Sequence, residues 1–144
     1  LDRLAGDGRT VRRSAGPEEH VAEKALRSRA PYHKEEKDHH MKKCRITVMR
    51  ITQYEDLMAQ YENPISHACD MEVGQVFLAN GWEKPEGFCQ SAWDTLSPFI
   101  LALSHGAENF YDGWMKNPKS AMLSCNDGFR PVSFLVEALD EDAD

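Results

Sequence analysis

Four cysteines are the residues of this sequence best suited to chemistry, because cysteine thiolates are preferred ligands of zinc and of iron–sulfur clusters. No two of them have the spacing of a CxxC motif, and the four are spread over the chain as Cys44, Cys69, Cys89 and Cys125. A common metal site would therefore require separate elements to converge in the fold. His67 and His105 are candidates to replace one sulfur. Inert buried thiols are the alternative interpretation, since free cysteine is among the most buried residue types.

Cys89 has a second candidate role, as a catalytic nucleophile that needs no metal. It lies where a helical pattern begins, and the positive end of a helix dipole stabilises a thiolate over a thiol. No neighbouring residue is indicated as its base. If it is exposed, we expect Cys89 to be a reactive thiol.

Asp127 and Arg130 place a carboxylate and a guanidinium close together in the turn-rich stretch after Cys125. Arg130 could bind the carboxylate or phosphate of a cofactor or small molecule. The alternative, which we favour, is structural: Asp127 caps the turn, and Arg130 pairs with it to fix a hairpin.

Apolar alternation predicts the strands that must position these residues. A period of two favours strands over Arg45–Thr52 and Val73–Ala79. Two further strands are predicted over Ala121–Cys125 and Val132–Ala138, joined through a turn rich in Asn, Asp and Gly.

Two helical regions separate the predicted strands. Thr52 and Glu55 have the spacing of a capping box, which predicts a helix beginning directly after the first strand. The second helix begins near Cys89, and Pro98 within it predicts a kink or a split into two short helices. The stretch Ala107–Lys119 has no clear period, so we expect a loop whose aromatic side chains dock on the core.

The resulting order β-α-β-α-β-β predicts an α+β fold, with a small, mainly antiparallel sheet of about four strands and two or three helices packed on it. We assign residues 41–139 to this single domain and residues 140–144 to a solvated acidic tail. Residues 1–40 are poor in patterned apolar side chains, so we expect a disordered extension. The abrupt start of a strand pattern after Met41 is what we expect if Met41 is the natural start and the preceding residues are translated upstream or added sequence.

Composition and charge exclude several classes of function. The chain carries a net charge of −7, and from Met41 onward acidic residues outnumber basic ones about twofold, which argues against nucleic-acid binding. No apolar run is long enough to span a membrane. The charged N-terminal stretch lacks the apolar core of a signal peptide, so we expect a cytoplasmic protein with reduced thiols.

Three stretches resemble the marks of a conserved, uncharacterised family of small bacterial and archaeal proteins: Lys43–Val48, Trp82–Cys89 and Cys125–Val132. Their sequences KCRITV, PEGFC and CNDGFRPV are similar to the family's KC-[KR]-ITV, PEGFC and C-x-DG-x-RPV motifs. The resemblance implies recurring cysteines at the positions of all four cysteines of this chain. The family often has a doubled cysteine where this chain has Ser124 and Cys125, so one thiol is missing here.

Three functions remain open from the sequence. The one we favour is a small accessory protein that binds a metal, zinc or an iron–sulfur centre, or acts in redox chemistry through its cysteines. The second is an enzyme or small-molecule-binding protein that uses Cys89 and an Asp127–Arg130 pocket. The third is a non-catalytic subunit that binds a protein partner or a second copy of itself, for example along an open sheet edge.

Overall fold

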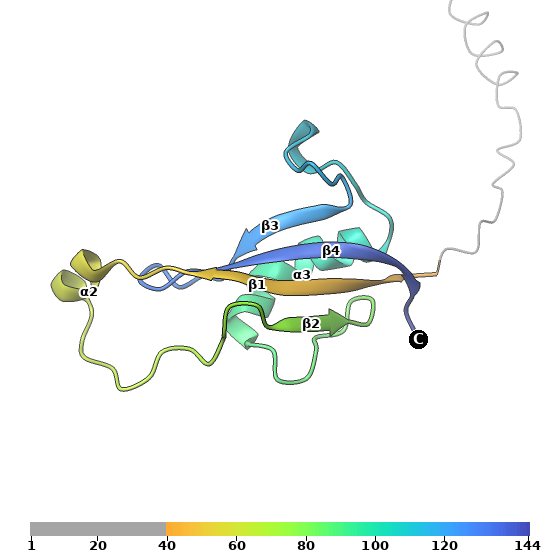
Figure 1. Cartoon of the computed structure of the whole chain (residues 1–144). Helices are drawn as coiled ribbons and strands as arrows, with labels where there is room; N and C mark the ends of the chain where they lie inside the picture. The colour runs from red at the N-terminus through yellow and green to blue at the C-terminus, as the bar shows by residue number, and fades with distance from the viewer. Residues whose placement is uncertain (1–39) are drawn as a thin grey trace, which may run out of the picture. The chain divides into compact units, whose positions relative to one another are not determined.

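The structure is a computed structural model that describes residues 40–144. This part of the chain has the predicted α+β fold, a four-stranded antiparallel sheet with two α-helices (Figure 1). We predicted disorder for residues 1–40. Except for His40, these residues lie outside the part of the chain that the structure describes. The elements are β1 (Lys42–Ile51), α2 (Glu55–Tyr61), β2 (Val76–Ala79), α3 (Gln90–Ser104), the short 3-10 helix η1 (Phe110–Asp112), β3 (Ser120–Ser124) and β4 (Val132–Asp142).

The first and last strands, β1 and β4, lie side by side at the centre of the sheet, whose order is β2-β1-β4-β3 (Figure 1). In this register Ile46 of β1 lies between Phe77 of β2 and Val136 of β4. Because side chains alternate along a strand, these three face the same side of the sheet and their chain neighbours face the other. The alternation of residues that predicted the strands therefore separates the side chains of one face of the sheet from those of the other.

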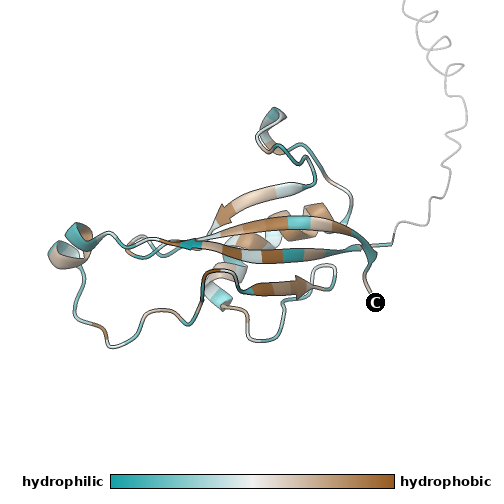
Figure 2. Ribbon diagram, in the orientation of Figure 1, coloured by the Kyte–Doolittle hydropathy of each residue, from teal (hydrophilic) through white to brown (hydrophobic). Residues whose placement is uncertain are grey.

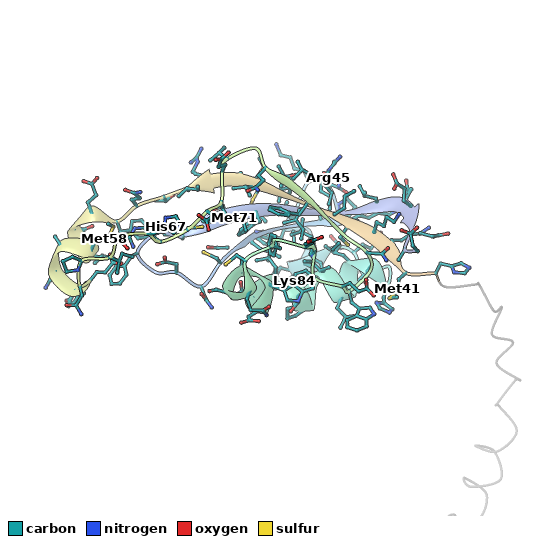
Figure 3. The ribbon with its side chains drawn as sticks, turned by 90° about the horizontal axis from the view of Figure 1, so that it is seen from below. Met41, Arg45, Met58, His67, Met71 and Lys84 are labelled. Atoms are coloured by element: carbon teal, nitrogen blue, oxygen red, sulfur yellow. The ribbon has the colours of Figure 1, made fainter. Side chains whose placement is uncertain are left out.

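One face of the sheet is covered by α3, which lies along it in the view from below (Figure 3). Leu96, Ile100 and Leu103 recur at helical spacing and are fully buried against the strands. Burial of such side chains stabilises the fold by about 1.5–3 kcal/mol each. The buried apolar residues of this core are Cys44, Ile46, Val48, Met71, Ala79, Phe88, Ala92, Leu96, Ile100, Leu103, Ala121, Val132, Phe134 and Val136.

No helix within residues 40–144 covers the opposite face of the sheet (Figures 1 and 3). Leu78, Val76 and Met122 point to this face and are 55%, 53% and 38% exposed. The strands are apolar along much of their length (Figure 2). An ion pair between Arg45 and Glu137, 2.8 Å long, crosses from β1 to β4 on the same face. The sheet therefore presents a mixed apolar and charged surface on this side.

Pro98 lies inside α3, which runs as one helix from Gln90 to Ser104, so of the two predicted alternatives, a kink or two short helices, the second does not occur. Pro98 itself is exposed, while the buried stripe continues on both sides of it through Leu96 and Ile100. Packing of that stripe against the sheet outweighs the loss of one backbone hydrogen bond. Neither α2 nor α3 combines the length and the apolar character that a membrane-crossing helix needs.

The helix α2 begins at Glu55, so the predicted capping box at Thr52 is wrong. The backbone N–H of Thr52 donates to the carbonyl of Pro131 at 3.0 Å, and that of Tyr54 donates to Phe129 at 2.9 Å. These bonds extend the pairing of β1 with the β4 side of the sheet past Ile51, which delays the start of the helix. No residue of α2 is buried, and the helix lies beyond the end of the sheet (Figure 1).

The acidic end of the chain continues β4 as far as Asp142 instead of leaving the sheet after Leu139. Lys42 contacts Asp142 at 2.5 Å and Lys43 contacts Asp144 at 3.2 Å. The backbone N–H of Ala143 also donates to the carbonyl of Met41 at 2.6 Å. The two lysines at the start of β1 thus offset the negative charge that made a free tail the expected outcome.

The loop that contains η1 docks only one of its aromatic side chains on the core. Phe110 packs against Phe99 of α3 with ring centroids 5.3 Å apart. Tyr111 is 74% exposed and stacks edge-on with Trp114, at 5.4 Å, instead of entering the core. The expectation that all these aromatics dock was therefore wrong for Tyr111 and Trp114.

Candidate functional site

Three of the four cysteines line one small cavity of about 90 Å³ between the N-terminal end of α3 and the end of β3. Cys69, Cys89 and Cys125 come from three segments that are far apart in the sequence. Asp127 and Ser91 supply polar groups to the same cavity, and Phe134 and Val132 supply apolar walls. The fold therefore gathers three thiols that the sequence alone could not place together.

Cys89 is positioned by the start of α3, as the sequence predicted. It is the N-cap residue, directly before Gln90, and its carbonyl accepts the N–H of Trp93 at 2.9 Å. The preceding residue, Phe88, is buried and packs against Phe77 and Phe134 with ring centroids 4.9 and 5.5 Å apart. This aromatic anchor fixes a half-buried thiol at the positive end of a helix that is 15 residues long.

Cys125 is positioned by the turn that joins β3 to β4. Its backbone N–H donates to the carbonyl of Val132 at 3.0 Å, and its Sγ accepts the N–H of Val132 at 3.3 Å. Two side chains of α3 bind the same turn: Thr95 Oγ1 donates to the carbonyl of Ser124 at 3.1 Å, and Ser91 Oγ donates to Asn126 Oδ1. These bonds fix Cys125 beside the N-terminal turn of α3.

Cys69 comes from the irregular segment between α2 and β2, residues 62–75, which we call the linking segment. Cys69 is exposed, and its Sγ accepts the N–H of Met71 at 3.4 Å. Met71 is buried and is the only residue between Cys69 and Gly74 that enters the core (Figure 3). Beyond it, Gly74 donates its N–H to the carbonyl of Val48 at 2.8 Å. Cys69 is thus the most accessible of the three thiols.

Cys44 does not reach this cavity. It is fully buried on the α3 side of β1, and its Sγ donates to the carbonyl of Ile100 at 3.9 Å. Burial raises the pKa of its thiol to about 11. A neutral thiol among apolar side chains contributes to core packing. Because Cys44 lies in the core and not in the cavity, the four cysteines do not converge on one site.

Asp127 caps the turn, as predicted, but Arg130 pairs with a different carboxylate. Asp127 Oδ1 accepts the backbone N–H groups of Phe129 and Arg130 at 2.8 and 3.1 Å. The guanidinium of Arg130 binds both carboxylate oxygens of Glu62, at 2.7 and 2.8 Å, and each side chain is 14% exposed. This hydrogen bonding by Glu62 raises the pKa of Arg130. The predicted Asp127–Arg130 pair is therefore wrong, and Arg130 already holds a carboxylate of its own chain.

Of the two histidines considered as ligands, only His67 lies near the cysteines. It lines a cleft of about 300 Å³ together with Cys69 and Cys89, and its Nε2 is 2.6 Å from Asp70 Oδ1. His105 is the C-cap of α3, with its Nδ1 donating to the carbonyl of Leu101 at 2.8 Å. His105 follows Cys89 by 16 residues along α3, which places the two about 24 Å apart at a rise of 1.5 Å per residue.

Two partners in this region were missed by sequence reasoning. Asp70 stands three residues after His67, a spacing that a search for local acid–histidine pairs would have found. Glu62 is 68 residues away from Arg130, and no local signal connects them.

As they stand, no three Cys, His, Asp or Glu side chains among residues 40–144 are close enough together to hold a metal ion. Comparison with known proteins adds no assignment: no family model, no curated protein and no solved structure matches this chain.

Proposed function

We propose that this chain is a small accessory protein that binds a thiophilic metal centre through Cys69, Cys89 and Cys125. The observation that carries the proposal is the cavity of about 90 Å³ that these three side chains line together. Binding one ion would require the three sulfurs to move closer together than they stand in this structure. Thiolate sulfur is the ligand that zinc and iron–sulfur centres prefer.

The backbone supplies polar contacts beside each of the three cysteines. Cys69 Sγ and Cys125 Sγ each accept a backbone N–H, from Met71 and Val132. Cys89 stands at the N-terminal end of α3, where the free N–H groups of the first helical turn carry partial positive charge. Two of the three sulfurs therefore have a backbone hydrogen-bond donor, and the third stands at a helix N-terminus.

The environment of Cys44 differs from that of the three cysteines at the cavity. Its only hydrogen-bond partner within the described chain is a carbonyl oxygen, which stabilises the S–H form, and its pKa is raised by burial. Removing Cys44 is therefore expected to leave metal binding unchanged.

The proposal is tested by measuring metal bound to the full chain, purified anaerobically with a thiol-free reductant. We expect one centre per chain by inductively coupled plasma mass spectrometry, together with competition against a chromophoric chelator. Cys89→Ser and Cys125→Ser should each lose the centre, whereas Cys44→Ala should keep the wild-type stoichiometry. Circular dichroism of each variant checks that the fold is retained.

The proposal fails if wild-type protein binds neither zinc nor iron above the level of the Cys89→Ser/Cys125→Ser double variant. It also fails if Cys44→Ala alone abolishes binding, because the ligands would then lie elsewhere.

A further inference from the structure

We propose that the loop between α3 and β3 binds a proline-rich segment of a partner protein. We call residues 107–119, which lie between these two elements, the aromatic loop. It displays Tyr111 and Trp114, which pack against each other outside the core and are 74% and 44% exposed. The aromatic loop follows the C-terminal end of α3, whereas the cysteine cavity lies at the N-terminal end. The inference therefore concerns a different surface from the proposed metal centre.

The aromatic loop is held to the domain at both ends. Phe110 packs on α3, and the backbone N–H of Asn109 donates to the carbonyl of Pro118 at 2.8 Å, which closes the loop. At the second end the hydroxyl of Ser120, a buried residue, donates to the carbonyl of Asn117 at 2.7 Å. The loop projects away from the sheet beside β3 (Figure 1). A loop held in one conformation loses little entropy when it binds a partner.

The backbone of the aromatic loop is strained at the residues that display the rings. Asn109, Tyr111 and Asp112 have positive φ angles of 60°, 50° and 53°, in the left-handed region that residues other than glycine rarely occupy. Such a conformation costs on the order of 1 kcal/mol per residue. The ring of Tyr111 lies outside the core, so core packing does not explain the strain at this residue. Strained residues cluster at binding sites, where they fix the direction of a side chain.

The two exposed rings offer both apolar faces and hydrogen-bond donors. Their planes are 79° apart and their centroids 5.4 Å apart, so the edge of one ring meets the face of the other and the remaining faces stay open. The hydroxyl of Tyr111 and the indole N–H of Trp114 form no hydrogen bond with any residue from 40 to 144. Buried tyrosine and tryptophan usually satisfy these groups, and both residue types are enriched among the residues that dominate binding at interfaces.

A polyproline II helix has the chemistry that matches these two features. It contains no internal hydrogen bonds, so its carbonyl oxygens are available to accept from an indole N–H and a phenol hydroxyl. Its pyrrolidine rings pack on aromatic faces, as they do in other proteins that recognise proline-rich segments. The helix is also extended before it binds, so it can lie across a projecting surface without a deep pocket.

Charge favours a proline-rich segment with basic ends. Glu108 and Asp112 of the aromatic loop are exposed and form no ion pair with any described residue, and Lys116 is the base of the loop in the same situation. From Met41 onward acidic residues outnumber basic ones about twofold, so the domain as a whole attracts cationic peptides. Nucleic-acid bases also stack on such rings, but their phosphates would be repelled by the same charge.

The experiment is a calorimetric titration of the full chain with a peptide of about eight prolines that has lysines at both ends. Trp114→Ala should weaken binding at least about 10-fold, because a stacking surface is lost. Tyr111→Phe keeps the ring and removes only the hydroxyl, so it should weaken binding about 5-fold. Circular dichroism of each variant checks that the fold is retained.

The matched control is Trp82→Ala, which should bind the peptide as wild type does. Trp82 is 58% exposed, lies between β2 and α3, and has no aromatic partner among the described residues. A peptide with alanine in place of every proline should not bind, and one with glutamate in place of the lysines should bind more weakly.

Three results would overturn the inference. The first is a wild-type affinity for the proline peptide no higher than that of Trp114→Ala. The second is equal binding of the lysine-flanked and glutamate-flanked peptides, which would contradict the stated chemistry of the partner. The third is self-association of the chain, detected by sedimentation velocity and lost in Trp114→Ala, because a second copy would then occupy the aromatic loop. Each result leaves the proposed metal centre untouched.

Discussion

Cys44 and Cys89 show how far the environment decides what one residue type can do. Cys44 of β1 is fully buried under α3, whereas Cys89 directly precedes α3 and lines two cavities. The thiol of Cys44 donates to a carbonyl oxygen, whereas Cys89 is the N-cap residue of α3 and its side chain makes no hydrogen bond to the first helical turn. Burial makes the Cys44 sulfur part of the core packing, and its place beside two cavities makes the Cys89 sulfur a candidate ligand.

Cys44 should make the stability of the fold depend on pH in the alkaline range. The pKa of its thiol is about 11 in the folded chain against an ordinary value of 9.0. The group therefore contributes fully below pH 9, and its contribution is lost as the pH rises through 11, because the unfolded chain releases the proton first. At about 1.4 kcal/mol per pKa unit, the loss by pH 11 is about 2 kcal/mol.

The measurement is the free energy of unfolding of wild type and Cys44→Ala, from urea titrations with a reductant between pH 7 and 11. At pH 7 the variant should be less stable by about 1 kcal/mol, because one buried atom is removed from the core. That difference should shrink above pH 9 and change sign near pH 10. Parallel stability curves for the two proteins would contradict the assignment.

At the scale of the element, Pro98 inside α3 lowers the stability of the helix. The ring removes one backbone hydrogen bond inside a helix of 15 residues, and the residue is exposed, so its side chain supports no core contact. Proline is about 3 kcal/mol less favourable than alanine inside a helix, and proline recovers up to about 1 kcal/mol by restricting the unfolded chain. Pro98→Ala should therefore stabilise the protein by about 2 kcal/mol in thermal or urea unfolding.

A suitable control is Leu101→Ala, a replacement at another exposed position of α3 that should change stability by less than about 0.5 kcal/mol. A loss of stability in Pro98→Ala would mean instead that the proline bends α3 to fit the sheet.

Helices and strands could be predicted from the sequence where the local pattern of apolar residues matches the burial of those residues in the fold. The alternation of Ile46 and Val48 with polar neighbours is a property of the strand itself, so β1 was placed close to its true position. The start of α2 was misplaced because the N–H groups of Thr52 and Tyr54 bind carbonyls of the β3–β4 connection, which no local pattern encodes. The candidate site could not be predicted from the sequence, because Cys69, Cys89 and Cys125 line one cavity only through tertiary packing.

At the scale of the whole molecule, the two faces of the sheet should respond differently to mutation. Ile46 lies under α3 and is fully buried, so Ile46→Ala should cost about 3 kcal/mol. Leu78 and Met122 lie on the uncovered face, and their replacement by Thr should change the free energy of unfolding by less than about 0.5 kcal/mol.

Urea titrations at two protein concentrations complete this test. Stability that is independent of concentration, with small effects of Leu78→Thr and Met122→Thr, is the outcome expected for a face in contact with water. Concentration-dependent stability, lost in both variants, would show instead that a second copy of the chain covers this face.

The position of β1 and β4 at the centre of the sheet has a consequence for how the protein is made. The first strand of the described chain pairs along its whole length with the last one, from Lys42 opposite Asp142 to Ile51 opposite Val132. A growing polypeptide on the ribosome cannot complete the hydrophobic interior until Val132, Phe134 and Val136 of β4 have left the exit tunnel. Until then the only strand that β1 can pair with is the four-residue β2, so its apolar side chains stay available to chaperones until β4 has emerged.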